Sequence, residues 1–263
     1  MKKPQIQAQL KQFGWIVAGL IGLFVVLSAV NRKKRTYSAN RIEVEIEDVF
    51  TADSNLITKD EVSELLQESF TYGITDNALK EIDVQRAERV LERNAFVKNA
   101  DVFIDRQNLI HARIQQRQPM VRIIDGENRS YYLDKDGNYM PLSDHYTPRV
   151  LVMTGFIRPY EVGFMQNERH HLYDLFSLVT RLQEDEFFAR LIEQVHVSQN
   201  SDILLIPKLG KQQILFGRYL DAKNMEQKLQ RLKIFYKEAL PREGWTKYSL
   251  IDIRFENQVV CGR

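Results

Sequence analysis

The spacing of hydrophobic residues predicts a membrane helix near the start of the chain. Residues 13–30 carry no charged side chain, and a run of this length is just sufficient for a helix to cross a bilayer. Lys11 and the basic residues 32–35 flank it, where their side chains can reach the membrane interface. A cleaved signal peptide is the alternative, but its apolar region is usually shorter, and residues 27–29 fit its cleavage site poorly. We therefore predict a short tail over residues 1–12, a transmembrane helix over 13–30 and a linker over 31–40.

Residues 41–118 predict a small module of five elements. Alternation of polar and apolar residues is followed by two stretches at helical spacing, and then by alternation again. The first helix begins with a capping box of Thr58 and Glu61, and Asp83 can cap the second. The expected elements are a strand over 41–46, helices over 58–70 and 83–93, and a hairpin of strands over 97–105 and 109–117. A three-stranded sheet covered on one face by two helices buries this pattern.

From residue 119 to residue 263 the pattern becomes mainly β. Short apolar stretches are separated by Gly, Asn, Asp or Pro, as is typical of strands joined by turns. The expected strands lie over residues 121–124, 131–133, 139–140, 150–153, 194–198, 203–206, 213–216 and 249–255. Two amphipathic helices interrupt them, one over 171–184 and one over 221–240 that ends at Pro241. The predicted fold class is α+β, with domains over 41–118 and 119–263 and a strand at the C-terminal edge.

The uneven distribution of charge argues against nucleic-acid binding. Seven of the 37 Lys and Arg residues lie in residues 1–35, which contain no Asp or Glu. The remaining 30 basic residues face all 35 acidic residues, so residues 36–263 carry a net charge of −5. An acidic folded region lacks the positive potential that binding to phosphates requires. Basic residues are almost equally frequent on the two sides of the apolar segment, so charge alone leaves its orientation open.

The sequence contains no motif that indicates catalysis. Residues 134–138 begin like a calcium-binding loop, but the glycine comes at the fourth position instead of the sixth, and a hairpin turn explains the same residues. His170 and His171 are adjacent and lack the i, i+4 spacing of two metal ligands on a helix, so we interpret them as surface residues. The single Cys261 excludes an internal disulfide framework. We expect no catalytic residue, no metal and no cofactor; a membrane-anchored enzyme is the rival hypothesis.

Three stretches form a recognisable series of motifs. The first is AFVKNADV at residues 95–102, followed by QRQPMV at residues 116–121. The second is YLDKDGNYMPL at residues 132–142, followed by LVMTG at residues 151–155. The third is IDIRFENQVV at residues 251–260. In this order, and together with the expected elements, they resemble the FtsQ/DivIB family of bacterial cell-division proteins over essentially the whole chain.

The resemblance implies a fold, a location and a function. The first module is similar to the POTRA domain of that family, and the bulk of the chain is expected outside the cytoplasmic (inner) membrane, with the N-terminus in the cytoplasm. The implied function is a non-enzymatic scaffold of the divisome at the septum, linking early and late division proteins. The implied partners are an FtsB/DivIC-type protein and its FtsL-type associate, bound by addition of a strand to the C-terminal edge of the sheet. Further divisome components are candidate partners of the POTRA domain.

The resemblance also implies a set of partner-binding residues. Carried over position by position, they are Arg218, Phe255, Asn257, Gln258, Val259, Val260, Gly262 and Arg263. Val259 and Val260 are expected in the same strand as Phe255. The sequence departs from the family pattern at residues 48–55, which replace a compact turn, and at Arg263, where relatives can have an aromatic residue. The alternative function is that of a POTRA-containing protein in protein export or outer-membrane assembly.

Overall fold

The structure is a computed structural model, and it describes residues 42–47, 54–69, 83–107 and 109–263. The predicted tail, transmembrane helix and linker, at residues 1–12, 13–30 and 31–40, lie outside these described residues. Among the helices of the described part, none combines the length and the hydropathy that crossing a membrane requires. The described residues divide into two compact units, one of residues 42–47, 58–69, 83–107 and 109–115 and one of residues 54–57 and 116–263.

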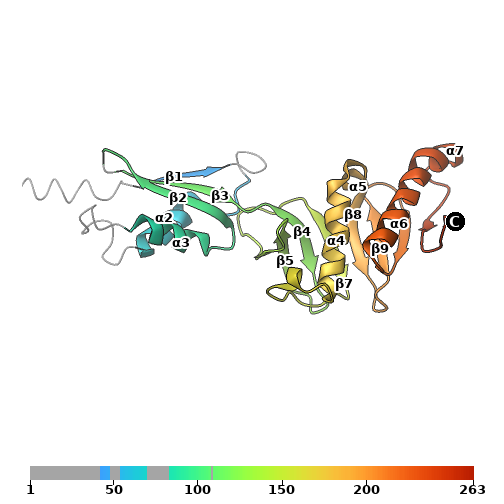
Figure 1. Ribbon diagram of the computed structural model, residues 1–263. Coiled ribbons are helices and arrows are strands. Elements are labelled where there is room, and N and C mark those ends of the chain that lie inside the picture. Colours follow the sequence, from blue (N-terminus) through green and yellow to red (C-terminus); the bar gives the residue numbers. More distant parts are fainter. Residues whose placement is uncertain (1–41, 48–53, 70–82, 108) are drawn as a thin grey trace, which may run out of the picture. The chain divides into compact units, whose positions relative to one another are not determined.

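The first unit is a three-stranded sheet covered on one face by two helices (Figure 1). In chain order its elements are β1 (Ile42–Glu47), α2 (Lys59–Ser69), α3 (Val84–Glu92), β2 (Val97–Ile104) and β3 (Ile110–Gln116). The strand order is β1-β3-β2, and β1 is parallel to β3. Alternate residues are buried in β1, in β3 and in β2 from Ala100 onward, because only one face of the sheet packs on the helices. The predicted order of elements is confirmed.

The predicted helix starts in this unit are confirmed by their hydrogen bonds. The N–H of Thr58 donates to Oε2 of Glu61 at 2.8 Å, and the N–H of Glu61 donates to Oγ1 of Thr58 at 3.2 Å, which is a capping box. At α3, the N–H of Arg86 donates to Oδ1 of Asp83 at 2.9 Å. These caps satisfy N–H groups that the helices themselves leave without an acceptor.

The second unit is built on a nine-stranded sheet. Its strands are β4 (Pro119–Ile124), β5 (Ser130–Asp134), β6 (Tyr139–Met140), β7 (Leu151–Gly155), β8 (Ile192–Val197), β9 (Ile203–Pro207), β10 (Gln213–Gly217), β11 (Leu250–Asp252) and β12 (Val260–Gly262). They lie in the order β12-β11-β10-β9-β8-β7-β4-β5-β6. β7 is parallel to both of its neighbours, β4 and β8, and β10 is parallel to β11. Within the described part of the chain, β12 and β6 are the two edges of this sheet.

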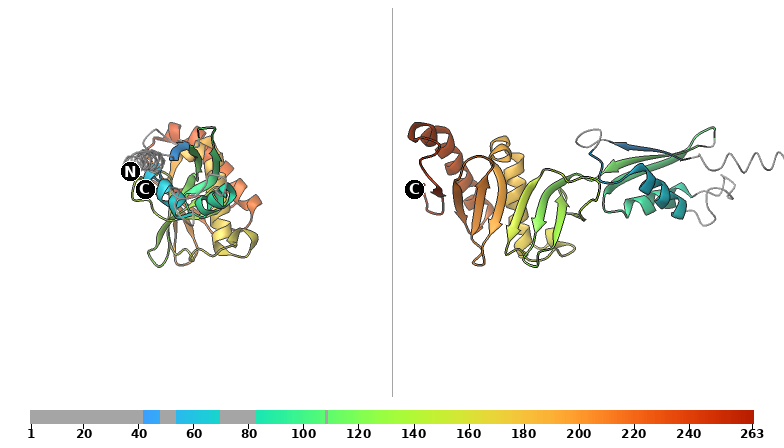
Figure 2. Two further views of the ribbon diagram at one scale, coloured as in Figure 1. Left: turned by 90° about the vertical axis from the view of Figure 1, so that its left-hand side faces the viewer. Right: turned by 180° about the vertical axis from the view of Figure 1, so that it is seen from behind.

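The helices of the second unit cover one face of the sheet. They are α4 (His171–Glu184), α5 (Glu186–Leu191), α6 (Ala222–Ile234) and α7 (Leu240–Glu243), with a 3-10 turn η2 (Phe164–Gln166) and a π-helical segment η3 (Phe235–Ala239). Figure 1 shows α4 and α6 in front of the strands, and the view from behind in Figure 2 shows the strands on the near side. The core lies between the two layers, where Val195 and Leu205 of the sheet and Val179 and Leu229 of the helices are fully buried.

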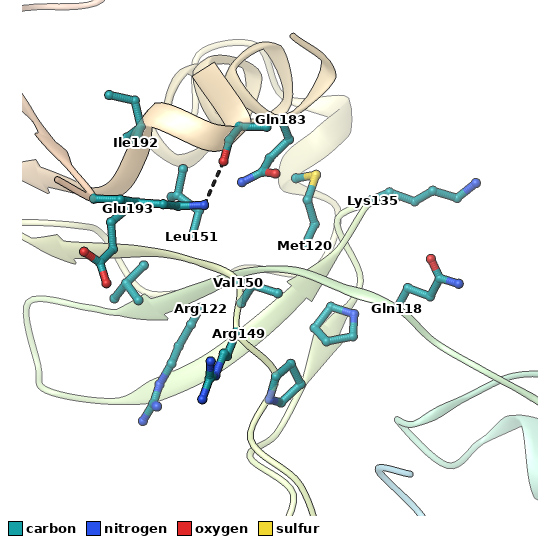
Figure 3. Close-up of a pocket in the computed structure, with 15 residues that line it drawn as sticks. Gln118, Met120, Arg122, Lys135, Arg149, Val150, Leu151, Gln183, Ile192 and Glu193 are labelled. Atoms are coloured by element: carbon teal, nitrogen blue, oxygen red, sulfur yellow. Dashed lines mark hydrogen bonds between the residues drawn. The ribbon is translucent and has the colours of Figure 1, made fainter. Parts of the chain in front are cut away.

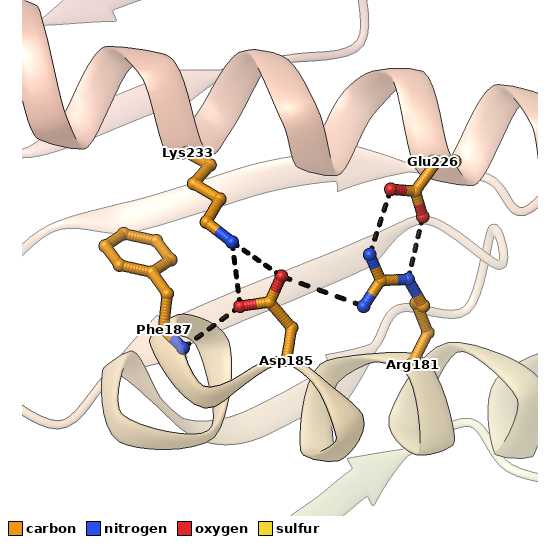
Figure 4. Close-up of polar contacts among 5 residues, drawn as sticks. All are labelled: Arg181, Asp185, Phe187, Glu226 and Lys233. Carbon is orange, nitrogen blue, oxygen red and sulfur yellow. Dashed lines mark hydrogen bonds and ion pairs between the residues drawn. The ribbon is translucent and has the colours of Figure 1, made fainter.

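A network of charged side chains joins α4 and α5 to α6 (Figure 4). Nε and Nη2 of Arg181 donate to the two carboxylate oxygens of Glu226 at 2.8 and 2.9 Å. The carboxylate of Asp185 accepts two hydrogen bonds from Nζ of Lys233, at 3.0 and 2.7 Å, and one from the N–H of Phe187 at 3.0 Å. Asp185 therefore caps α5 and holds α6 at the same time. Nη1 of Arg181, 3.7 Å from Asp185, connects the two pairs.

Three predictions for the second unit are wrong. The hydrophobic spacing does not predict α5, because this helix is only six residues long. Pro241 does not end the helical segment that follows Asp221, because it lies in the first turn of α7, where a proline's missing N–H is tolerated. The unit thus has four α-helices among its described residues instead of two. The strand predicted over residues 249–255 is shorter, since β11 ends at Asp252 and the chain folds back as β12.

Two smaller predictions have opposite outcomes. Residues 134–138 form the predicted turn, in which Oδ1 of Asp134 accepts hydrogen bonds from the N–H groups of Asp136 and Asn138 at 2.9 and 2.8 Å. His170, interpreted above as a surface residue, is buried. Its Nδ1 accepts a hydrogen bond from the N–H of Leu172 at 3.2 Å, so His170 caps α4. A histidine ring can supply the acceptor that Ser or Asp usually provides at this position.

Candidate functional site

The last strand of the chain forms an open edge of the sheet. β12 pairs antiparallel with β11, with Leu250 opposite Gly262, Ile251 opposite Cys261 and Asp252 opposite Val260. No strand of the described residues lies on its other side. The outer N–H and C=O groups of an edge strand can pair with another chain. Val260 is 45% exposed, so this edge also presents an apolar side chain to solvent.

A clamp of hydrogen bonds holds the loop between β11 and β12. Nε and Nη2 of Arg254 donate to the carboxylate of Asp252 at 2.9 and 2.6 Å, and the N–H of Arg254 donates to Oδ1 of Asp252 at 3.0 Å. The hydrogen bonds from Arg254 lower the pKa of Asp252, which keeps the carboxylate charged. On α6, Nη2 of Arg231 donates to the carbonyl oxygen of Ile253 at 3.2 Å. The clamp leaves Phe255 45% exposed.

The end of β10 is shaped to accommodate Arg254. Gly217 has a φ of +77°, and a Cβ atom at this position would lie 2.7 Å from Cγ of Arg254. Glycine therefore allows the side chain of Arg254 to lie against the backbone. Next in the chain, the carbonyl oxygen of Arg218 accepts a hydrogen bond from Nζ of the buried Lys228 at 3.1 Å. Burial lowers the pKa of Lys228, and this hydrogen bond fixes the backbone at Arg218.

A groove of about 350 Å³ lies beside the clamp. Its helical side comes from α6, η3 and α7, and its other side is the chain that leads into β12. It is lined by Arg231, Ile234, Phe235, Glu238, Ala239, Arg242, Asn257, Gln258 and Val259. Ile234, an apolar residue at the end of α6, is 47% exposed. An apolar groove with charged residues around it, adjacent to an open sheet edge, is suited to binding a polypeptide.

Comparisons with known proteins agree with this architecture. The family model described as FtsQ/DivIB, C-terminal related, matches residues 118–262, which is more than half of the chain. The chain belongs to the FtsQ/DivIB family. A second model, for a POTRA-like domain, matches residues 38–115, so the first unit is a POTRA-like domain.

Two curated relatives of this FtsQ/DivIB chain carry the name cell division protein FtsQ. The protein from Salinibacter ruber is 27% identical over 177 residues, which cover 66% of this chain and 67% of the relative. The protein from Rhodothermus marinus is 28% identical over 179 residues, which cover 66% of this chain and 63% of the relative. The chain thus spans about two thirds of the length of the curated relatives that it matches.

The structure brings most of the predicted site residues of this family member together. Asn257, Gln258 and Val259 line the groove, while Val260 and Gly262 belong to β12 and Arg263 follows it. The expectation that Val259 and Val260 share a strand with Phe255 is wrong, because the chain reverses at Asn257, which has a φ of +58°. The side chain of Arg218 is exposed, and its role toward this site stays a prediction.

The sequence predicts the helix over residues 221–240 but assigns none of its residues to the binding site. Four apolar residues at helical spacing, Met225, Leu229, Leu232 and Tyr236, account for the buried face of this segment. Ile234 and Phe235 lie outside that series, although both are apolar. Phe235 packs partly against the core, whereas Ile234 is exposed, so an apolar residue off the buried face was the signal in the sequence for a second apolar contact surface on this helix.

Proposed function

We propose that this chain acts in bacterial cell division as a non-enzymatic scaffold of the divisome. The observation that carries the proposal is the FtsQ/DivIB match over residues 118–262, the region that ends in the open edge strand β12. The curated relatives named cell division protein FtsQ support the same role. In this proposal, residues 13–30 anchor the chain in the cytoplasmic membrane, the N-terminus is cytoplasmic, and both units lie outside the cytoplasm at the septum.

The proposed partner is an FtsB/DivIC-type protein with its FtsL-type associate. A strand of the partner adds to β12, where backbone hydrogen bonds supply affinity and alternate side chains supply specificity. Phe255 and Val260, each 45% exposed, supply apolar contacts beside this strand. Asn257, Gln258 and Val259 contact the part of the partner that enters the groove, Gly262 and Arg263 contact the end of the added strand, and Arg218 provides a positive charge next to it. Further divisome components bind the POTRA-like unit.

Titration of the purified full chain with the partner complex tests the binding residues. We expect Phe255→Ala and Val260→Asp each to weaken binding at least about fivefold, since losing a central apolar contact typically costs about 1–3 kcal/mol. Phe156→Ala and Val162→Asp are matched controls, because these residues are 58% and 92% exposed and follow β7, which four strands separate from β12 in the sheet. Equal affinities for test and control variants would refute binding at this edge.

Depletion of the chain in its host tests the cellular role. Cells that lose a divisome scaffold are expected to elongate without forming septa, and a fluorescent fusion of the chain is expected at the division site. The Val162→Asp chain should restore division, whereas the Val260→Asp chain should not. Normal division after depletion, together with defects in protein export, would support the alternative function in export or outer-membrane assembly.

A further inference from the structure

A larger groove lies elsewhere on the second unit, at the end of the sheet where the parallel strands β4, β7 and β8 begin (Figure 3). Its volume is about 830 Å³. Apolar side chains line it, including Met120, Val150 and Ile192. In the sheet order, β9, β10 and β11 separate this region from β12, so the groove is distinct from the partner edge proposed above.

The charged residues of this groove are predominantly basic. It is lined by Arg122, Lys135, Arg149 and Lys208, and these four residues define what we call the basic groove. The only carboxylate among the residues that line it is Glu193. Residues 36–263 as a whole carry a net charge of −5, so the groove is locally basic within a part of the chain that is acidic overall. Such a local concentration of charge favours an anionic ligand.

The four cations of the basic groove form no ion pair with any carboxylate of the described residues. Nε of Arg122 donates to the hydroxyl of Ser130 at 3.0 Å, and Nζ of Lys208 donates to the carbonyl oxygen of Ala189 at 2.8 Å. These partners are neutral. Other basic residues of the same unit differ, since Arg129 and Arg254 lie 2.9 and 2.6 Å from carboxylate oxygens.

Arg122 on β4 and Arg149, two residues before β7, both line the basic groove (Figure 3). Like charges that line one groove repel each other, and a carboxylate that accepts hydrogen bonds from a guanidinium group offsets this repulsion. Arg149 is exposed and Arg122 is half-buried, so both can reach a bound ligand. The arrangement is thus complementary to a negatively charged group on the ligand.

We propose that the basic groove binds an acidic, extended segment of a partner protein. Carboxylates of that segment pair with Arg122 and Arg149, while its apolar side chains contact Met120 and Val150. A single small anion would leave the apolar surface uncovered, since a groove of about 830 Å³ holds several residues. The acidic character of the surrounding chain opposes binding of a long polyanion such as nucleic acid. The second unit therefore has two separate binding surfaces, an edge strand and a basic groove.

Fluorescence anisotropy with a designed peptide tests the proposal on the purified full chain. The probe is a fluorescein-labelled peptide of about ten residues in which Glu alternates with Leu or Ser, extended over about 33 Å. We expect saturable binding in the micromolar range that weakens with added salt. The double variant Arg122→Glu/Arg149→Glu should lose at least about tenfold in affinity. Arg149→Glu alone should lose several-fold, and it reports on binding without altering a described side-chain contact.

Matched controls separate this surface from general charge effects and from the partner edge. Arg169→Glu/Lys223→Glu reverses two exposed charges of the same unit outside the groove and should leave peptide affinity unchanged. Val260→Asp should also leave it unchanged, so failure of the basic groove and failure of the β12 site can be told apart. Equal binding of a peptide with Gln in place of Glu, no effect of the double variant, or no saturation at about 1 mM would overturn the proposal. Binding to phosphatidylglycerol vesicles that depends on Arg122 and Arg149, without peptide binding, would overturn it in favour of a lipid ligand.

Discussion

Removal of the Asp185 carboxylate should destabilise the second unit by a predictable amount. Asp185 is the N-cap of α5, and replacing such a cap with alanine costs about 1 kcal/mol. It also accepts two hydrogen bonds from the ammonium group of Lys233, and a bond to a charged group contributes about 1.5–3 kcal/mol. The side chain of Lys233 is 26% exposed, so water partly replaces the lost partner and the lower end of that range applies. We therefore expect Asp185→Ala to lower the unfolding free energy by about 2.5 kcal/mol.

Urea unfolding of the full chain, followed by the fluorescence of Trp245, measures this loss. Trp245 belongs to the second unit and its ring lies 6.3 Å from that of Tyr236 in η3, so its signal reports on this unit. The comparison is made in a Trp15→Phe background, because Trp15 is the other tryptophan of the chain. Asp144→Ala serves as the control, since Asp144 is exposed, and it should change stability by less than about 0.5 kcal/mol. A loss below about 1 kcal/mol for Asp185→Ala would refute the reasoning.

The pH dependence of the same variant provides an independent check. Hydrogen bonds from Lys233 lower the pKa of Asp185 in the folded state. An unfolded chain has the ordinary value of about 3.9, so the carboxylate stabilises the fold fully above that pH. The stabilisation is lost as the pH falls through the lower folded-state pKa. The stability difference between the original chain and Asp185→Ala should therefore shrink below about pH 4, and a difference that grows there contradicts the ion-pair explanation.

Three further predictions concern single residues. Gly217→Ala places a Cβ 2.7 Å from Cγ of Arg254 at a φ of +77°, so we expect urea unfolding to show a loss of about 1–2 kcal/mol, and an unchanged midpoint would contradict this. Gln116→Leu removes the acceptor that lies 2.7 Å from the buried N–H of Leu56, and the expected loss in the same assay is about 1–3 kcal/mol; a neutral substitution would show that this N–H needs no such acceptor. Burial raises the pKa of the Cys261 thiol, so iodoacetamide should alkylate it several-fold more slowly at neutral pH than a free cysteine peptide, and equal rates would contradict that burial.

The elements that sequence predicts well are those whose signal is local. The helix over residues 171–184 is found as predicted, because its six buried side chains recur at helical spacing. The capping box of Thr58 and Glu61 and the turn over residues 134–138 are also found, because each needs only neighbouring residues. The order of the sheet has no such local signal. β10 and β11 are parallel neighbours although more than thirty residues separate them, and the chain between them forms α6, η3 and α7.

The strand predicted over residues 249–255 is not the edge strand of the sheet, and the candidate site shows why. Ile251 to Phe255 alternates apolar and polar residues, which is the pattern of a continuous strand. In the structure, the carboxylate of Asp252 accepts a hydrogen bond from the N–H of Arg254, and a side chain that binds a nearby backbone N–H competes with pairing along the sheet. β11 ends at this point, and the chain turns back to form β12 as the new edge. Asp252 and Arg254 fit the pattern of a continuous strand in the sequence, but their hydrogen bond lies where β11 ends in the structure. The chain reversal that follows allows residues 257–259 to line the groove beside β12.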